Sequence, residues 1–258
     1  MANTLKGFVS LGATLLRPRR GAVAVGHRRT PEQTLVLFEA EYCPYCRYVR
    51  EALTALDLDA LIYPIPKRGQ RFKEQLLAMG GKPQIPFLVD PNTDSKLYES
   101  TSIVEHLYRT YGPEGVKVPS LSLTSSLMAT LLRGSKGMFS APGRAPDEPL
   151  ELYSFEASPF ARLVRETLCE LEVPFLLRNV GKTSGRLAEW MPPNLRHKRG
   201  YAPQSRNRQQ LAERGGRVMV PYLVDPNSGV SMYESEDIQR YLRETYGPSA
   251  VDAPLTVD

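Results

Sequence analysis

Two kinds of hydrophobic pattern alternate along the chain. Short apolar runs such as residues 35–38 (LVLF) have strand composition, whereas residues 50–56 (REALTAL) place apolar side chains at helical spacing. In order, the pattern predicts a strand, a helix, a second strand, a second helix, two short strands joined by residues 90–92 (DPN), and a helix that ends at residues 111–112 (YG). This order predicts a small mixed α/β sheet with helices on its faces.

The same pattern occurs twice. Residues 35–51 align without gaps on residues 150–166 at an offset of 115, and residues 85–92 align on residues 220–227 at an offset of 135. The second copy therefore carries 20 more residues between these two blocks. Each copy, at about 80 residues, is large enough for one hydrophobic core. The repeat therefore predicts two tandem domains within the 258 residues.

A short basic segment precedes each copy. The sequence ATLLR occurs at residues 13–17 and again at residues 129–133. Residues 1–31 hold five arginines and no acidic residue, with leucines near helical spacing, which predicts a basic amphipathic helix. A targeting presequence has a similar composition, but the internal copy cannot be a cleaved presequence. The pattern therefore favours a helix that packs on its own domain or lies on a membrane surface, and no apolar run reaches the roughly 18–20 residues that span a bilayer.

Two of the three cysteines form the motif CPYC at residues 43–46, directly after the first strand. Cys43 is therefore expected at a helix N-terminus, where unpaired backbone N–H groups and the helix dipole favour the thiolate. Arg47 and Arg50 are expected to add positive charge there. The proline suits the first helical position, and Cys46 lies one turn away, within disulfide reach of Cys43. The motif predicts a redox dithiol with a lowered Cys43 pKa.

A zinc site is the competing interpretation, because two cysteines at this spacing make half of a zinc knuckle. The remaining ligand candidates are not paired at ligand spacing; they are Cys169, His27, His106 and His197. We therefore expect no metal, although an iron–sulfur cluster shared between two chains stays open. Three cysteines with one exchange pair also indicate a reducing, cytoplasmic compartment rather than a secreted disulfide framework.

These motifs together resemble the glutaredoxin and glutathione S-transferase branch of the thioredoxin-fold superfamily. The CPYC motif resembles the dithiol site of glutaredoxins, and Ile85-Pro86 resembles the cis-proline loop of the family. Glu99-Ser100 resembles the transferase element that binds the γ-glutamyl end of glutathione. The resemblance covers both copies.

The resemblance implies an α/β fold with two tandem thioredoxin-like domains, each a small mixed sheet flanked by helices. The all-helical C-terminal domain of family transferases is expected to be absent, because the chain stops at Asp258 just after the second copy. The predicted segments are a basic amphipathic leader helix (1–33), thioredoxin-like domain 1 (34–112), a linker with a second leader helix (113–148), thioredoxin-like domain 2 with a basic insertion (149–248) and a tail (249–258).

The resemblance implies a glutathione-dependent thiol–disulfide oxidoreductase in which Cys43 is the nucleophile and Cys46 the resolving thiol. One alternative is a glutathione transferase, or an enzyme of glutathione-dependent dehalogenation or isomerisation, that uses Cys43 or Ser158. A non-catalytic glutathione-binding or membrane-surface adaptor is the other alternative.

Glutathione is the expected co-substrate. Candidates to bind it are Tyr45, Lys82, Ile85, Pro86, Glu99 and Ser100. The main chain of Ile85 would pair with the cysteinyl segment as an added strand does. Ser100, at a helix start, would hold a carboxylate, and Glu99 would accept from the ammonium group. Lys82 would contact the glycine carboxylate; helix capping by Glu99 and Ser100 and simple solvation of Lys82 are the alternatives.

The second copy departs from the motif, because Ser158 replaces the attacking cysteine and Ala161 the resolving one. This copy therefore cannot run dithiol chemistry. Candidates for a second glutathione site are Ser158, Val220, Pro221, Glu234 and Ser235. The serine would donate a hydrogen bond to a glutathione thiolate, while a decayed copy kept for packing or partner binding is the alternative. Cys169, within the following helix, is interpreted as a packing residue.

The net charge of +5 and a pI near 9.1 suit anionic partners, including glutathione, but are modest for nucleic acid. Residues 182–217 hold nine Lys or Arg against two Glu, together with Trp190 and Tyr201. This segment is interpreted as a mobile surface loop, with docking to an acidic partner or anionic lipid as the alternative. Residues 1–30 and 182–217 could also place the protein at a membrane surface, and a homodimer is a further possibility.

Overall fold

Two halves of the chain repeat one order of elements, as the hydrophobic pattern predicts. The computed structural model describes residues 21–120, 137–183, 187–191, 195 and 201–248. The first half (residues 35–112) contains β2 (Leu35–Glu39), α2 (Pro44–Ala55), β3 (Ala60–Pro64), α3 (Lys73–Gly80), β4 (Phe87–Asp90), β5 (Ser95–Tyr98) and α4 (Ser100–Tyr111). The second half (residues 150–247) contains β6 (Leu150–Ser154), α6 (Pro159–Glu170), β7 (Phe175–Asn179), α8 (Arg206–Gly215), β9 (Tyr222–Asp225), β10 (Val230–Tyr233) and α9 (Ser235–Tyr246).

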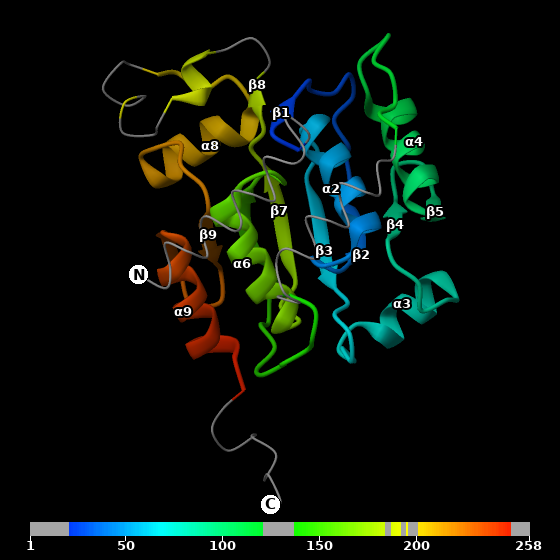
Figure 1. The fold of residues 1–258 in the computed structure, drawn as a ribbon, viewed down its shortest axis with the longest axis vertical. Coiled ribbons are helices and arrows are strands. Elements are labelled where there is room, and N and C mark those ends of the chain that lie inside the picture. The colour runs from blue at the N-terminus through cyan, green and yellow to red at the C-terminus, as the bar shows by residue number, and fades with distance from the viewer. Residues whose placement is uncertain (1–20, 121–136, 184–186, 192–194, 196–200, 249–258) are drawn as a thin grey trace, which may run out of the picture.

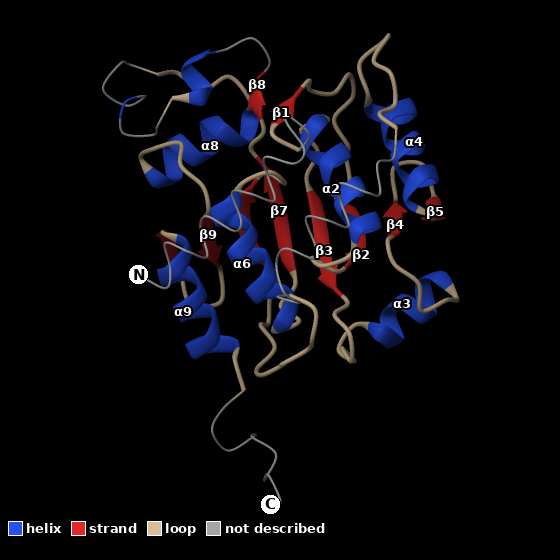
Figure 2. Cartoon of the chain, in the orientation of Figure 1, coloured by secondary structure: helices blue, strands red, loops and turns tan. Residues whose placement is uncertain are grey.

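One continuous sheet runs through both halves, with the strand order β10-β9-β6-β7-β3-β2-β4-β5 (Figures 1 and 2). In each half the first two strands pair in parallel and the hairpin strands pair antiparallel. At the centre of the sheet β3 and β7 pair antiparallel, with Ile62 opposite Phe175. The expected small mixed sheets are therefore joined edge to edge, which pairs two strand edges that separate halves would expose.

The core lies on both faces of this sheet. Leu37 belongs to the largest buried cluster, which includes Leu53 of α2 and Leu168 of α6. Its neighbour Phe38 points to the opposite face, since successive strand residues alternate, and packs with Leu76 of α3. Helices α2, α4, α6 and α9 thus cover one face, and α3 and α8 cover the other.

The segments that precede the two halves are exchanged between them. Strand β1 (Val23–Ala24), ahead of the first half, pairs in parallel with β8 (Lys182–Thr183) of the second half. Phe139, ahead of the second half, forms a parallel bridge with Lys67 of the first half. The segment that precedes each half therefore pairs with the backbone of the other half.

The two predicted leader helices fall mainly on residues 1–20 and 121–136, which lie outside the described residues. Residues 21–33 of the first predicted segment contain β1 and loop instead of helix. Residues 249–258, the predicted tail, also lie outside the described part. Among the residues described, no helix combines the length and apolar character needed to cross a bilayer.

The interpretation of residues 182–217 as a mobile loop is wrong for much of its described part. This segment contains β8, the short 3₁₀ helix η1 (Leu187–Trp190) and the helix α8. Glu189 of η1 is buried and accepts hydrogen bonds from the amide of Thr183 and the hydroxyl of Tyr201. It also forms an ion pair with Arg208 of α8, at 3.7 Å. The carboxylate of Glu189 therefore joins β8, η1, Tyr201 and α8 within this segment.

A buried ionic cluster joins the helices α2 and α6. Its members come from both halves; they are Glu39, Glu41, Arg47, Arg50, Glu156, Arg162 and Arg165. The Nε of Arg50 donates to Glu156 at 2.8 Å, and the Nε of Arg165 donates to Glu41 at 3.0 Å. Because buried charges are costly without partners, each half needs the carboxylates of the other.

Candidate functional site

Cys43 occupies the N-cap of α2, as the sequence predicts. Its sulfur accepts a hydrogen bond from the amide of Cys46 at 3.4 Å, and Pro44 occupies the first helical turn. The side chain is 8% exposed, so the sulfur lies at the edge of the core. Backbone N–H groups at a helix start favour a negative sulfur.

The two thiols of the motif have opposite electrostatic environments. A hydrogen bond from the Cys46 thiol, helped by the amides of Cys46 and Tyr45 and by Arg50, lowers the pKa of Cys43 to about 7. Complete burial raises the pKa of Cys46 well above its ordinary value, and the same hydrogen bond and the charge of Cys43 act in this direction too. This difference in pKa favours Cys43 as the attacking thiolate and keeps Cys46 protonated until the later, resolving step.

The arginines of α2 have different positions from those expected. Arg50 does act on the Cys43 sulfur, but Arg47 donates its Nε to Glu156 of the second half at 3.1 Å. Arg50 therefore adds positive charge at Cys43 as expected, whereas the guanidinium of Arg47 is directed into the ionic cluster. Sequence reasoning missed the carboxylates, although Glu41 and Glu156 occupy the same position of the repeat, two residues before the motif.

Part of the predicted glutathione set lies next to the motif. Ile85 packs against the buried cluster that contains Cys43 and Cys46, and the Ile85–Pro86 peptide bond is cis. Tyr45, two residues after Cys43, is 45% exposed, and its backbone amide acts on the sulfur of Cys43.

The other predicted binding residues lie at the start of α4 and on the surface. Glu99 adopts φ of 63° and occupies the N-cap of α4, but its side chain makes no capping hydrogen bond, so the helix-cap interpretation does not explain it. Its Oε1 instead accepts from Gln84 Nε2 at 2.6 Å. Ser100 begins α4 and is buried, whereas Lys82 is exposed with its Nζ 5.9 Å from the Tyr98 ring centroid.

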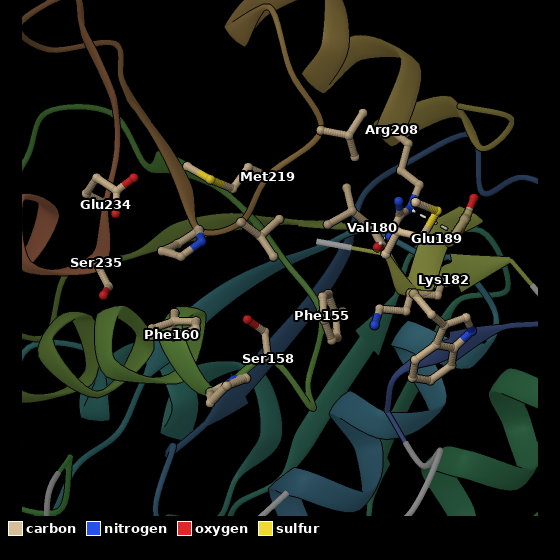
Figure 3. Close-up of a pocket in the computed structure, with 16 residues that line it drawn as sticks. Phe155, Ser158, Phe160, Val180, Lys182, Glu189, Arg208, Met219, Glu234 and Ser235 are labelled. Carbon is tan, nitrogen blue, oxygen red and sulfur yellow. Dashed lines mark hydrogen bonds and ion pairs between the residues drawn. The ribbon is translucent and has the colours of Figure 1, made fainter. Parts of the chain in front are cut away.

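The predicted second site surrounds a cavity of about 720 Å³ in the second half (Figure 3). All five residues predicted for this site line it: Ser158, Val220, Pro221, Glu234 and Ser235. The Val220–Pro221 peptide bond is cis, and Glu234 adopts φ of 67° at the N-cap of α9. The repeat therefore keeps the backbone geometry of the first site.

Ser158 occupies the N-cap of α6, the place that Cys43 takes in α2. Its hydroxyl oxygen accepts a hydrogen bond from the amide of Ala161 at 3.3 Å. A hydroxyl that accepts in this way keeps its own hydrogen for donation. The serine can therefore donate to an anionic sulfur held in the cavity.

Most of the remaining cavity wall is apolar and aromatic, and sequence reasoning missed it. Phe155, Phe160 and Met219 line the cavity together with Trp190 from the insertion (Figure 3). The Nζ of Lys182 lies 3.8 Å from the centroid of the Trp190 ring. Two features of the sequence pointed to this wall. The chain has a single tryptophan, and the insertion that contains it occurs only in the second copy.

Among the residues that the structure describes, no group of three or more His, Cys, Asp or Glu side chains is arranged to hold a metal ion. His106 hydrogen-bonds the buried carboxylate of Asp90 at 2.8 Å, and His27 contacts the carbonyl of Leu56 at 3.0 Å. Both described histidines therefore have structural partners.

The parallel strand pair, the hairpin, the N-cap cysteine and the cis-proline loop define a thioredoxin-fold protein. The family model "Glutathione S-transferase, N-terminal domain" matches residues 37–115 and 152–250, more than half of the chain. The chain belongs to this family.

Similarity to individual proteins is more remote. No curated protein matches the chain. A glutathione transferase of Bombyx mori is 26% identical over 36% of this chain and 42% of its own, with a TM-score of 0.32. A Leishmania protein described as a unique trimeric glutathione transferase is 14% identical over 84% of this chain and 68% of its own, with a TM-score of 0.28. The chain thus spans less than half of the Bombyx protein that it matches.

Proposed function

We propose that the protein is a glutathione-dependent thiol–disulfide oxidoreductase with Cys43 as nucleophile and Cys46 as resolving thiol. One observation carries this proposal: the Cys43 sulfur sits at a helix N-cap and accepts from the amide and thiol of Cys46, which lowers its pKa to about 7. At neutral pH about half of such thiols are thiolates, the form that attacks disulfides. Membership of the glutathione S-transferase N-terminal family supports glutathione as the reductant.

The reaction follows from the two environments. The Cys43 thiolate attacks one sulfur of a disulfide, a mixed disulfide forms, and the other sulfur leaves as a thiolate that takes up a proton. The negative charge of Cys43, which raises the pKa of Cys46, is then gone, so Cys46 loses its proton more readily. Cys46 attacks the Cys43 sulfur and releases the reduced substrate. Two molecules of glutathione then reduce the Cys43–Cys46 disulfide and leave as oxidised glutathione.

Glutathione would be placed by the residues around the motif. The main chain of Ile85, which packs against the thiol cluster, would pair with the cysteinyl segment. The buried N-terminus of α4 at Ser100 would hold the γ-glutamyl carboxylate. Glu99 would accept from the ammonium group, exchanging its present bond with Gln84.

The decisive test is the reduction of a glutathione mixed disulfide by glutathione, coupled to glutathione reductase. We expect activity in the wild type, its loss in Cys43→Ser, and retention in Cys46→Ser, because a monothiol suffices for glutathione adducts. Protein disulfides should need both thiols. Full activity in Cys43→Ser would overturn the proposal.

A second candidate function is supported by the cavity at Ser158. Its apolar and aromatic wall offers space for an electrophile beside a serine that can donate to a thiolate. Conjugation of an aromatic electrophile with glutathione, lost in Ser158→Ala and kept in Cys43→Ser, would establish a transferase reaction in the second half. Activity that follows Cys43 alone would exclude it.

We also propose that residues 34–112 and 149–248 are tandem thioredoxin-like domains. The repeated order of elements and the two segments matched by the family support this division. A fusion of two complete copies explains why the second half keeps the geometry of a site whose cysteines it lacks.

A further inference from the structure

All three cysteines of the chain lie in one place. Cys169, in the last turn of α6, is 2% exposed and belongs to a buried cluster with Ala40, Cys43 and Cys46, while Tyr42 and Ile85 pack against it. Cys169 packs, as the sequence suggested, but it packs in the cluster that holds the two thiols of the first half. The second half therefore contributes a thiol to the redox motif.

The ionic cluster fixes α6 beside the motif. Arg165 of α6 binds both carboxylate oxygens of Glu41, at 3.0 and 3.1 Å, and Arg50 of α2 pairs with the same carboxylate at 3.2 Å. The backbone amide of Glu41 acts on the thiol of Cys169, and that of the preceding residue, Ala40, acts on the thiol of Cys46. The thiols of Cys46 and Cys169 are thus held by the amides of consecutive residues.

The repeat shows what this position holds in the other half. Thr54 of α2 aligns with Cys169, accepts from the amide of Glu156 at 3.2 Å and donates to Asn179 at 2.8 Å. In the first half, the hydroxyl of Thr54 therefore makes a structural hydrogen-bonded contact with the second half. A cysteine occupies this repeat position only at Cys169, where the side chain packs against the half that carries the dithiol motif.

We propose that Cys169 is a third thiol of the redox centre, which exchanges with the Cys43–Cys46 disulfide to give a Cys46–Cys169 disulfide. The proposal rests on the proposed function, because that disulfide forms during turnover. The Cys169 sulfur bonds to the Cys46 sulfur, the Cys43–Cys46 bond breaks, and Cys43 leaves as a thiolate. One disulfide replaces another, so no oxidant or reductant is consumed.

The proton of Cys169 has an acceptor nearby. Burial raises the pKa of Cys169 well above its usual range, so the thiol must lose its proton as it attacks. The carboxylate of Glu39 acts electrostatically on both Cys46 and Cys169, and burial raises its own pKa to about 7. Glu39 takes the proton, and the low pKa of Cys43 makes it the better leaving group.

The exchange would restore the attacking thiolate while the oxidising equivalent is stored in a buried bond between the two halves. Cys43 could then take a second disulfide or a glutathione adduct before the first equivalent is discharged. Such a bond requires the two Cβ atoms to approach within about 4.5 Å, and the test measures whether the packed helices permit it.

The test follows which thiol remains after oxidation. The wild type and Cys169→Thr are oxidised with limiting oxidised glutathione, trapped in acid, unfolded at low pH, labelled with a maleimide and digested without reduction. The threonine matches Thr54 of the repeat and can accept from the amide of Glu41, as Thr54 accepts from that of Glu156. We expect the wild type to give a linked Cys46–Cys169 peptide and label on Cys43, both lost in Cys169→Thr.

Label confined to Cys169 in the oxidised wild type, with only the Cys43–Cys46 peptide linked, would overturn the inference. This result is separate from a failure of the proposed function. A wild type that reduces glutathione mixed disulfides but never links Cys46 to Cys169 refutes the third thiol alone. Linkage in a protein without glutathione-dependent activity refutes the proposed reaction and leaves the third thiol established.

Discussion

At the scale of single residues, one hydrogen bond between two thiols decides which of them reacts. Cys46 is completely buried and donates to Cys43, which stabilises charge on the more exposed sulfur. The helix start adds backbone donors, while Arg50, whose charge also lowers the pKa of Cys43, is shared with three carboxylates. The reactivity of Cys43 therefore depends more on its partner in the motif than on the positive charge of α2.

This dependence can be measured by alkylation. In the wild type, the rate of Cys43 modification by iodoacetamide should rise with pH and reach half its maximum near pH 7, because the thiolate reacts. Cys46→Ala removes the donor and should raise this midpoint towards that of an ordinary cysteine. Cys46→Ser keeps a donor and serves as the matched control; equal midpoints in the two variants would contradict the assignment.

Glu39 should make the stability of the protein fall as pH rises. Its folded pKa, raised by burial from 4.5 to about 7 although Arg50 opposes this, means that the folded state binds more protons than the unfolded state between these values. The stabilising contribution is complete below pH 4.5 and is lost as pH rises through 7. In urea unfolding at pH 5 and pH 8, Glu39→Gln should lose less stability over this interval than the wild type. Parallel losses in the two proteins would show that Glu39 does not titrate there.

At the scale of elements, the insertion of the second half forms a wall of the cavity. Glu189 ties η1 to β8 and α8 through its bonds to Thr183, Tyr201 and Arg208. Trp190, the next residue, lines the cavity beside Lys182. The first half has no counterpart of this wall, because the 20 additional residues occur only in the second copy.

The single tryptophan makes this wall observable. An S-alkyl glutathione that enters the cavity should change the fluorescence of Trp190 in the wild type. In Glu189→Ala the anchor is lost, and we expect the apparent affinity to fall about tenfold or more, since several buried hydrogen bonds of the wall disappear. Glu114→Ala, on the exposed loop that follows α4, is the control. Unchanged affinity in Glu189→Ala would show that the insertion does not shape the site.

Local patterns predicted the elements and the N-cap cysteine because strand composition, helical spacing and CPYC are properties of neighbouring residues. The repeat also grouped Ser158, Val220, Pro221, Glu234 and Ser235, which line one cavity, because it transfers a motif from one copy to the other. It could not find the cavity wall or the ionic cluster. Both depend on contacts between residues far apart, such as Arg50 with Glu156, which no local spacing encodes.

At the scale of the whole molecule, the two halves form one sheet and one ionic core. Glu156 receives Arg47 and Arg50 of the first half and Arg165 of its own. Removal of one partner from a buried ion cluster leaves charges uncompensated, which typically costs about 3–5 kcal/mol. The halves should therefore depend on each other for stability.

Glu156→Gln is expected to lower the free energy of unfolding by about 3–5 kcal/mol. Unfolding in urea, followed by circular dichroism and by Trp190 fluorescence, should remain one coincident transition, because the halves share their core. Glu114→Gln, which changes charge at an exposed position, should have an effect within about 0.5 kcal/mol. Separate transitions for the two signals would show that the halves fold independently.

The exchanged segments also impose an order of events during synthesis. Ala24 leaves the ribosome long before Thr183, its partner in the β1–β8 pair. At about 5–20 residues per second, a separation of about 160 residues corresponds to roughly 8–30 s of translation. For that interval the nascent first half lacks the α6 arginines that compensate Glu41 and holds a strand without its neighbour. The newborn chain therefore exposes an unpaired strand edge and an uncompensated carboxylate until its second half has emerged.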